Sequence, residues 1–296
     1  MSVLHKRDDF SKPYIFVLDL DGTIIGDCSY QSDIFNIQEI IKQSLVDGNF
    51  KKNEINLITK HKTLCDQTMM ECYNSKSKLI RPFFGLFINK IKKMYPNSFF
   101  FIYTASEKKW AIKEIKMIEA QNKIKFDRPI FTRSDCIFQD GEYKKSIEHV
   151  KPQILKTIKA KKTHDIRNNI LIIDNNPTFI DYKDNLLICP TYDYIHFKNL
   201  WENIPNEYMK IDKLKSIVSR LIGHKKMYGT HDKNNAKIME RIHRWLYKKY
   251  KIINKFNATY ENDTFWKDLY NMIVNNKIQI INKSIVETMQ KSIKVR

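Results

Sequence analysis

The feature that most constrains this chain is a short apolar run, Tyr14–Leu18, that ends in Asp19-Leu20-Asp21-Gly22-Thr23. A run of this kind, bounded by turn residues, is typical of a buried strand, and burial on both faces favours the centre of a parallel sheet. Asp19 and Asp21 share one face of an extended segment, so both can address one substrate. Neighbouring carboxylates repel, so we expect this pair to hold a cation or to divide its protonation between two roles. The alternative is that Asp21 and Gly22 merely form a turn that closes the strand.

Two later apolar runs end in side chains suited to the same chemistry. Ser98–Tyr103 leads into Thr104, and Asn169–Ile173 leads into Asp174 and Asn175. Helical periodicity lies between the three runs, which predicts βαβ units and a parallel sheet flanked by helices. The carboxyl ends of parallel strands meet at one edge, where ligands bind in open α/β sheets. Carboxylate and amide oxygens suit Mg²⁺, so a metal site is expected at this edge.

Helices are expected between these runs. The segment 84–91 has its apolar residues on one helical face, and the preceding Arg81-Pro82 suits a first helical turn. A second helix is expected over residues 107–121. The basic stretch Lys151–Lys162 is interpreted as the solvated face of a third helix.

Residues 24–80 form a predicted helical insertion after the first run. Apolar residues recur at helical spacing over residues 34–45, and Asn53 can cap a second helix that carries Leu57 and Ile58. Two interpretations of the insertion stay open. It is either a small cap over the site, which would select the substrate, or a helical flank beside the sheet.

Six short segments occur in the order of one known family. They are Asp19-Leu20-Asp21-Gly22-Thr23, Arg81-Pro82, Tyr103-Thr104-Ala105-Ser106, Arg133 with Cys136-Ile137-Phe138, Gly141-Glu142-Tyr143-Lys144-Lys145, and Asp174-Asn175-Asn176-Pro177. Over residues 13–195, these segments resemble the FCP/SCP-type phosphatases of the haloacid-dehalogenase (HAD) superfamily. These are the NLI-interacting-factor-like enzymes that act on the C-terminal domain of RNA polymerase II. The resemblance implies an α/β, Rossmannoid fold of the HAD type, a parallel sheet flanked by helices.

The resemblance also implies a role for each matching residue on the substrate side. Asp19 would be the nucleophile that forms an aspartyl-phosphate. Asp21 would be the general acid for the leaving alcohol and then the base that activates water. Thr104 and Lys145 would neutralise the transferring phosphoryl group, and Arg133 is a further candidate cation on the phosphate side.

Mg²⁺ is the cofactor that the resemblance implies, and a phosphorylated protein is the implied partner. The metal ligands would come from Asp19, from the backbone carbonyl of Asp21, and from Asp174 or Asn175. The expected activity is hydrolysis of phosphoserine or phosphothreonine in a protein, such as the RNA polymerase II tail. Two alternatives stay open, and the first is kept open by the basic carboxyl-terminal part and by Gly22, which stands where this family commonly has Glu. One is a phosphatase acting on nucleic-acid phosphate ends or a small metabolite, and the other is a non-catalytic scaffold that keeps the HAD fold.

The carboxyl-terminal part of the chain, residues 206–296, carries most of the positive charge. The whole chain has a formal net charge of +19, and this part holds 20 Lys or Arg against 8 Asp or Glu. Amphipathic stripes predict helices here, including one capped by Asn262-Asp263-Thr264 that buries Phe265 and Leu269. We expect a phosphatase domain over residues 1–205 and a basic α-helical domain or extension over 206–296. The extension could contact nucleic acid or an acidic protein, and ordinary solvated lysines are the simpler explanation.

The composition favours an intracellular protein. No uninterrupted apolar stretch approaches the ~20 residues that span a bilayer, and residues 1–11 lack the apolar region of a secretory signal. The five cysteines are sparse and odd in number, which fits free thiols in a reducing compartment such as the cytoplasm or nucleus. We therefore expect neither secretion nor a membrane partner.

Overall fold

The structure, a computed structural model, describes most of the region that carries the predicted site. The described residues are 13–26, 50–60, 63, 78–194, 211–212, 251–252 and 255–294. The chain divides into two compact units. The first unit contains Met1–Gly26, Ile80–Asp193 and Asn262–Arg296, and the second contains Asp27–Leu79 and Tyr194–Glu261.

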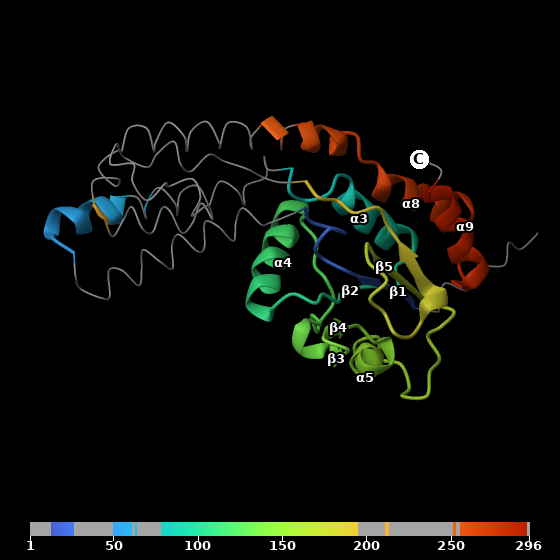
Figure 1. The fold of residues 1–296 in the computed structure, drawn as a ribbon. Helices are drawn as coiled ribbons and strands as arrows, with labels where there is room; N and C mark the ends of the chain where they lie inside the picture. The colour runs from blue at the N-terminus through green and yellow to red at the C-terminus, as the bar shows by residue number, and fades with distance from the viewer. Residues whose placement is uncertain are drawn as a thin grey trace, which may run out of the picture. The chain divides into compact units, whose positions relative to one another are not determined.

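The centre of the first unit is a four-stranded parallel sheet with the strand order β2–β1–β5–β6 (Figure 1). Its strands are β1 (Tyr14–Leu18), β2 (Ser98–Ile102), β5 (Ile170–Asp174) and β6 (Leu186–Ile188). Leu18 lies beside Ile102 on one side and Ile173 on the other, so β1, β2 and β5 end together. Every residue of β1 and β5 is buried, as expected for parallel strands covered on both faces. The predicted parallel sheet is confirmed.

One face of the sheet packs against helix α5 (Ile147–Thr157). Ile15 and Val17 of β1 belong to the same buried cluster as Ile147, Val150 and Ile154. These two strand residues face α5 because alternate side chains of a strand point to opposite faces of its sheet. Because α5 starts two residues after Lys145, its packing on the sheet also holds the Lys145 backbone close to the strand ends.

The opposite face of the sheet is built from aromatic rings. Phe16 of β1 stacks on Phe100 of β2 with ring centroids 4.6 Å apart. Phe87 of helix α3 (Phe84–Met94) meets Phe16 edge-on at 5.6 Å. Trp266 of helix α8 (Phe265–Asn275) is fully buried and lies 4.9 Å from Phe87. Helices α3 and α8 therefore form the second layer, and large ring areas buried in this way stabilise the fold.

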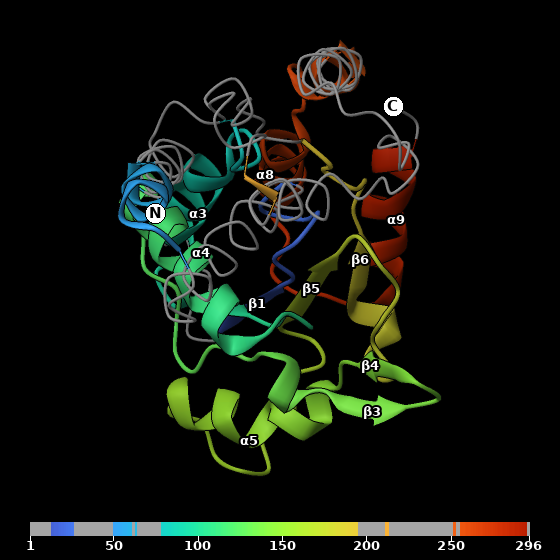
Figure 2. The ribbon, with the colours of Figure 1, turned by 60° about the vertical axis from the view of Figure 1, so that its left-hand side comes forward.

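Helix α4 and a short hairpin lie between β2 and α5 in the chain. Helix α4 spans Lys108–Asn122, and the antiparallel hairpin consists of β3 (Ile137–Gln139) and β4 (Glu142–Lys144). Asp140 and Gly141 form the two-residue turn with positive φ of 54° and 79°, which matches the twist of the paired strands. Figure 2 shows this hairpin beside α5. Its second strand leads directly into Lys145.

The helices predicted over residues 84–91 and 107–121 are confirmed by α3 and α4, with ends that differ by at most three residues. The basic stretch Lys151–Lys162 is helical only as far as Thr157, so that interpretation was wrong over its second half. Lys159 takes a left-handed conformation with φ of 56°, and the Ala160 amide donates to the Leu155 carbonyl at 3.0 Å. Left-handed residues with such backbone bonds end helices.

The carboxyl-terminal helices belong to the unit that contains the sheet. The predicted helix after residue 264 is confirmed by α8, which buries Phe265, Leu269 and Ile273. Helix α9 (Lys283–Lys294) lies along β6, where the Gln290 side chain accepts from the Ile188 amide at 2.8 Å and donates to its carbonyl at 2.9 Å (Figure 2). The structure thus divides the chain differently from the predicted boundary at residue 205.

The predicted insertion leaves the first unit and returns to it at one place. Ile25 pairs with Ile80 in an antiparallel bridge. Residues 52–60 are helical and belong to the second unit, and Ile58 is buried there. The periodic segment 34–45 and most of residues 206–261 lie outside the described residues. Both interpretations of the insertion, a cap over the site or a helical flank, therefore stay open. No helix among the described residues is long and apolar enough to cross a membrane.

Candidate active site

A buried lysine joins two carboxylates at the carboxyl ends of the central strands. Lys145 Nζ lies 2.5 Å from Asp19 Oδ1 and 2.7 Å from Asp174 Oδ2. All three side chains are almost fully buried, with exposures of 6% for Asp19, 2% for Lys145 and 1% for Asp174. Asp19 follows β1 and Asp174 ends β5, so the parallel pairing of these strands brings the two carboxylates together. The structure therefore brings together three residues that the sequence predicts for one site.

The segment after β5 holds Lys145 in place. The Lys145 amide donates to the Thr178 carbonyl at 3.0 Å, and the Ile180 amide donates to the Lys145 carbonyl at 3.0 Å. Farther along, Asp181 accepts from the Ser146 hydroxyl and from the Ile147 amide, the latter at 2.7 Å. These contacts fix the start of α5, because its first amides have no partner inside the helix.

Sequence reasoning missed Ser146 and Asp181. The only local signal was Ser146 at the start of the helix, where its hydroxyl oxygen accepts from the His149 amide at 3.1 Å. Asp181 is 35 residues away from Ser146 along the chain, and no spacing rule links the two positions.

The site leaves negative charge on its carboxylates. Burial raises the pKa of Asp19 to about 7, although Lys145 lowers it and Asp174 raises it again. Burial also lowers the pKa of Lys145, but the two carboxylates outweigh this effect and the net pKa lies above its usual value. The lysine therefore stays protonated, and its single positive charge cannot neutralise both carboxylates once they ionise. A divalent cation would balance the excess.

Asp21 faces a different set of partners from Asp19. Its Oδ2 accepts from the Ser106 hydroxyl at 2.5 Å and from the Thr104 hydroxyl at 3.4 Å. The Ser106 amide in turn donates to Thr104 Oγ1 at 3.1 Å. The Thr104–Ser106 turn after β2 therefore orients Asp21, which is partly exposed. Ser106 is a third residue whose contact with the site was not predicted, although it lies in the quoted Thr-Ala-Ser segment.

Gly22 allows a close approach between the first loop and Asn175. Its φ is +75°, and a Cβ atom placed there would lie 2.7 Å from Asn175 Nδ2. A larger residue would be strained in this left-handed conformation and would also displace the Asn175 side chain. The local geometry therefore requires glycine at position 22, where the family that the sequence resembles commonly has Glu.

Oxygen atoms converge beside Asn175. In one orientation of its side-chain amide, the nitrogen donates to the Asp21 carbonyl at 3.1 Å and to Asp19 Oδ2 at 3.3 Å. In the other orientation the amide oxygen takes that position and meets the same two oxygens, an arrangement that a cation between them would stabilise. The donors are the hard oxygens that Mg²⁺ prefers, so the residues present fit this metal.

The four predicted metal ligands do not contribute equally to this oxygen group. Asp174 instead accepts from Lys145, from the Asn176 amide at 2.7 Å and from the Thr178 hydroxyl at 3.2 Å. Among the described residues, no cluster of three or more His, Cys, Asp and Glu side chains could hold a metal. The candidate metal site therefore depends on the Asp21 carbonyl and the Asn175 amide as well as the Asp19 carboxylate.

Arg133 lies in a short 3₁₀ helix, η1 (Arg133–Asp135), apart from the carboxylates. Its Nε donates to the Ala105 carbonyl at 2.8 Å, and its guanidinium pairs with Glu107 at 3.3 Å. Its Cζ lies 5.2 Å from the ring centre of Tyr143 in the hairpin. These contacts connect Arg133 to the turn that carries Thr104, and a role in binding phosphate stays a prediction.

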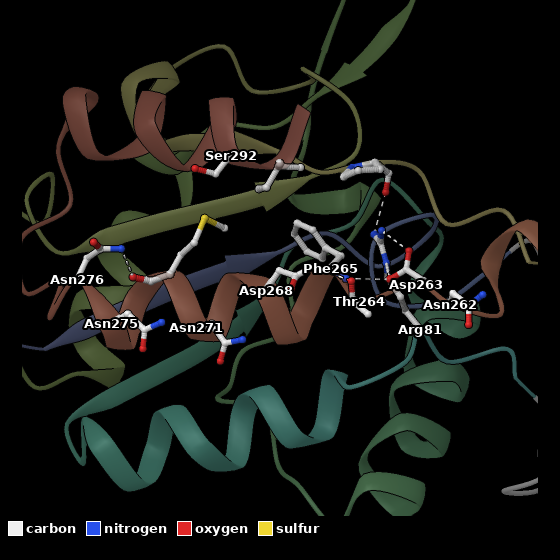
Figure 3. Close-up of a pocket in the computed structure, with 13 residues that line it drawn as sticks. Arg81, Asn262, Asp263, Thr264, Phe265, Asp268, Asn271, Asn275, Asn276 and Ser292 are labelled. Carbon is white, nitrogen blue, oxygen red and sulfur yellow. Dashed lines mark hydrogen bonds and ion pairs between the residues drawn. The ribbon is translucent and has the colours of Figure 1, made fainter. Parts of the chain in front are cut away.

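A pocket of about 550 Å³ lies away from these side chains. Its lining comes from the carboxyl-terminal segment together with Arg81 and Pro190, and it includes none of the predicted site residues (Figure 3). We locate the candidate chemistry at the strand ends rather than here, because the titratable groups gather at the strand ends.

Comparisons with known proteins agree with the family resemblance. Residues 14–211 match the family described as NLI interacting factor-like phosphatase. The CTD small phosphatase-like protein 2 of Dictyostelium discoideum is 33% identical over 97 residues, which are 33% of this chain and 14% of that protein. The chain thus matches only a small part of that relative.

Two solved structures of the RNA polymerase II CTD phosphatase Fcp1 are similar over most of this chain. The fission yeast enzyme, in a substituted form bound to beryllium fluoride, is 16% identical with a TM-score of 0.36, covering 94% of this chain and 70% of that one. A second structure, described as an essential RNA polymerase II CTD phosphatase, is 15% identical with a TM-score of 0.37 and the same coverage.

Proposed function

This chain belongs to the NLI interacting factor-like phosphatases, and we propose that it hydrolyses phosphate monoesters through an aspartyl-phosphate intermediate, with Mg²⁺ as its cofactor. The observation that carries the proposal is the position of Lys145 Nζ, 2.5 Å from Asp19 and 2.7 Å from Asp174. A buried carboxylate held by a lysine beside an oxygen-rich cation site suits nucleophilic attack on phosphorus.

The two aspartates near the end of β1 divide the proton chemistry between them. An Asp19 oxygen forms a bond to phosphorus while the bond from phosphorus to the substrate oxygen breaks. Asp21, held by Ser106 and Thr104, donates its proton to that leaving oxygen. Asp21 then takes a proton from water, which attacks the aspartyl-phosphate and returns the Asp19 carboxylate and free phosphate.

The remaining residues hold charge during both steps. Lys145 interacts with the negative phosphoryl oxygens and keeps Asp19 oriented, and the Thr104 hydroxyl donates to one of those oxygens. Asp174 positions Lys145. Mg²⁺, held by Asp19, the Asp21 carbonyl and Asn175, would neutralise the negative charge on the transferring group.

The proposed substrate is phosphoserine or phosphothreonine in a protein. Support comes from the family match and from the relative named CTD small phosphatase-like protein 2. A second candidate is a phosphate end of a nucleic acid, which the net charge of +19 favours because it attracts polyanions. A non-catalytic scaffold is the third candidate, and the intact set of acid, hydroxyl and lysine positions is the argument against it.

Substrate comparisons with the full chain test the proposal. With Mg²⁺ present, the wild type should hydrolyse an aryl phosphate, and Asp19→Asn should remove the activity. Phosphoserine and phosphothreonine peptides should then be compared with oligonucleotides phosphorylated at the 3′ or 5′ end. Faster turnover of the peptides supports the first candidate, and faster turnover of the oligonucleotides supports the second. If no substrate is hydrolysed above the Asp19→Asn background, the proposed activity is wrong.

A further inference from the structure

A buried ion pair joins the start of α3 to the carboxyl-terminal segment. Arg81 precedes α3, and Asp263 precedes α8. Arg81 Nε donates to Asp263 Oδ1 at 3.0 Å, and its NH2 group lies 2.8 Å from Oδ2 (Figure 3). The guanidinium is fully buried and the Asp263 side chain is 13% exposed. This two-pronged geometry is the most directional form of an arginine–carboxylate pair.

The third nitrogen of Arg81 points to the loops beside the candidate nucleophile. Its NH1 group donates to the Pro190 carbonyl at 2.8 Å and approaches the Thr23 carbonyl at 3.5 Å. The Arg81 backbone amide donates to the Ile24 carbonyl at 2.8 Å. Arg81 thus contacts both the loop after β1 and the segment after β6.

The loop that Arg81 contacts carries the partners of Asp19. Thr23 Oγ1 donates to Asp19 Oδ2 at 3.3 Å and accepts from the Asn175 amide at 3.1 Å. The Tyr192 amide donates to the Gly22 carbonyl at 2.7 Å, which joins this loop to the segment after β6. A shift of the loop would therefore move two groups that define the candidate nucleophile and metal site.

The buried arginine depends on Asp263 for its orientation. Asp263 is the only acidic residue of the described ranges within ion-pair distance of Arg81. The centres of the Phe265 and Tyr192 rings lie 4.5 Å and 5.5 Å from Cζ of Arg81. Such aromatic contacts stabilise a cation but do not replace a carboxylate. Asp263 Oδ1 also accepts from the Phe265 amide at 3.1 Å, so the start of α8 fixes where the carboxylate lies.

We propose that Asp263 is a positioning residue: acting through Arg81, it holds the Gly22–Ile25 loop in the conformation that orients Asp19 and Asn175. The carboxyl-terminal segment from Asn262 onward is then part of the catalytic machinery rather than an appendage to it. The structural part of this proposal is independent of the reaction, and its effect on catalysis rests on the proposed phosphatase function.

Hydrogen–deuterium exchange of the full chain tests the structural part. The amides of Ile24 and Ile25 donate to the Leu20 carbonyl at 2.9 and 3.1 Å, so they report directly on the loop. Asp263→Asn should speed exchange in residues 20–25, while β1 itself stays protected. Asp268→Asn is the matched control, because this carboxylate lies on α8 and accepts from Thr264. The control should leave the loop unchanged.

Steady-state kinetics with an aryl phosphate and Mg²⁺ test the catalytic part. Asp263→Asn should lower kcat by about 10- to 100-fold with little change in KM, because small misplacements of a nucleophile have effects of this size. Asp263→Glu keeps the charge and should recover part of the loss. Arg81→Lys keeps the positive charge but cannot make the two-pronged contact with Asp263. The double variant with Asp263→Asn should lower kcat little more than either single variant, because both substitutions remove the same contact.

Each outcome decides the proposal. Unchanged exchange in residues 20–25 of Asp263→Asn overturns it, and so does faster exchange spread equally over the sheet, which would indicate general destabilisation. If Asp263→Asn does not fold, the same comparison is made with Asp263→Glu, where unchanged loop exchange together with unchanged kcat overturns the proposal. If the wild type has no phosphatase activity, the exchange result still decides the positioning role, and the proposed function alone fails.

Discussion

Replacing Lys145 by methionine gives the sharpest test of the charge arrangement. Methionine has a similar length and volume but removes the ammonium group that lies 2.5 and 2.7 Å from two buried carboxylates. At these separations each pair attracts by about 6 kcal/mol with an effective dielectric constant of about 20. Desolvation of the buried ions offsets much of this attraction, so removing one partner of such a group destabilises by about 3–5 kcal/mol.

The loss should depend on pH in one direction. Burial already raises the pKa of Asp19 to about 7, and loss of Lys145 raises it further. A carboxyl whose pKa is raised by folding contributes stability that is present at low pH and lost as the pH rises through its folded value. The loss in free energy of unfolding caused by Lys145→Met should therefore be largest near pH 8. It should be clearly smaller near pH 5, where the Asp19 carboxyl is protonated in both proteins.

Urea unfolding of the full chain at these two pH values, without added metal, measures the effect. Lys144→Met is the matched control, because Lys144 is the adjacent lysine and pairs only with the exposed Glu142 among the described residues. The control should change stability by less than about 1 kcal/mol. An equal loss for both variants, or a larger loss for Lys145→Met at pH 5 than at pH 8, would refute the reasoning.

Three further predictions concern single side chains. Gly22→Ala places a methyl group 2.7 Å from the Asn175 amide, so Mg²⁺ should activate hydrolysis more weakly; Gly141→Ala, with equally positive φ and no neighbour within 4 Å, should not affect the metal response. Thr104→Val removes the hydroxyl that donates to the Asp21 carboxylate, and it should lower kcat for an aryl phosphate about 10²-fold. Burial raises the pKa of Glu119, but hydrogen bonds from the Phe126 amide and from Arg128 lower it overall. Glu119→Gln should therefore lower Tm at pH 7, and its Tm should converge with that of the wild type as the pH falls through the lowered pKa of this carboxyl.

The strand ends could be predicted from the sequence because their signal is local. Each apolar run stops at a polar residue, and parallel pairing then brings those residues together without further information. Asp19, Asp174 and Thr104 were found in this way. Lys145 was not, since lysines are common throughout the chain, and only its resemblance to a family motif identified it.

The contacts that hold the site could not be predicted because they join segments far apart in the chain. Arg81 and Asp263 are 182 residues apart, and each has an ordinary local explanation as a helix-start residue. The same holds for Asp181, whose partner Ser146 looks like a simple helix cap. Patterns along the sequence indicate which face of a helix or strand is buried. They do not indicate which distant side chain will pair with a given polar residue.

The contact between Gln290 and Ile188 covers one border of the sheet. A strand at the border of a sheet offers its peptide groups to any other extended chain, and β6 is such a strand among those that the structure describes. The Gln290 amide occupies both hydrogen-bonding positions of Ile188, as a neighbouring strand would. A version of the chain cut before Lys283 would expose this border, and fibrous aggregation through added strands would be its expected fate.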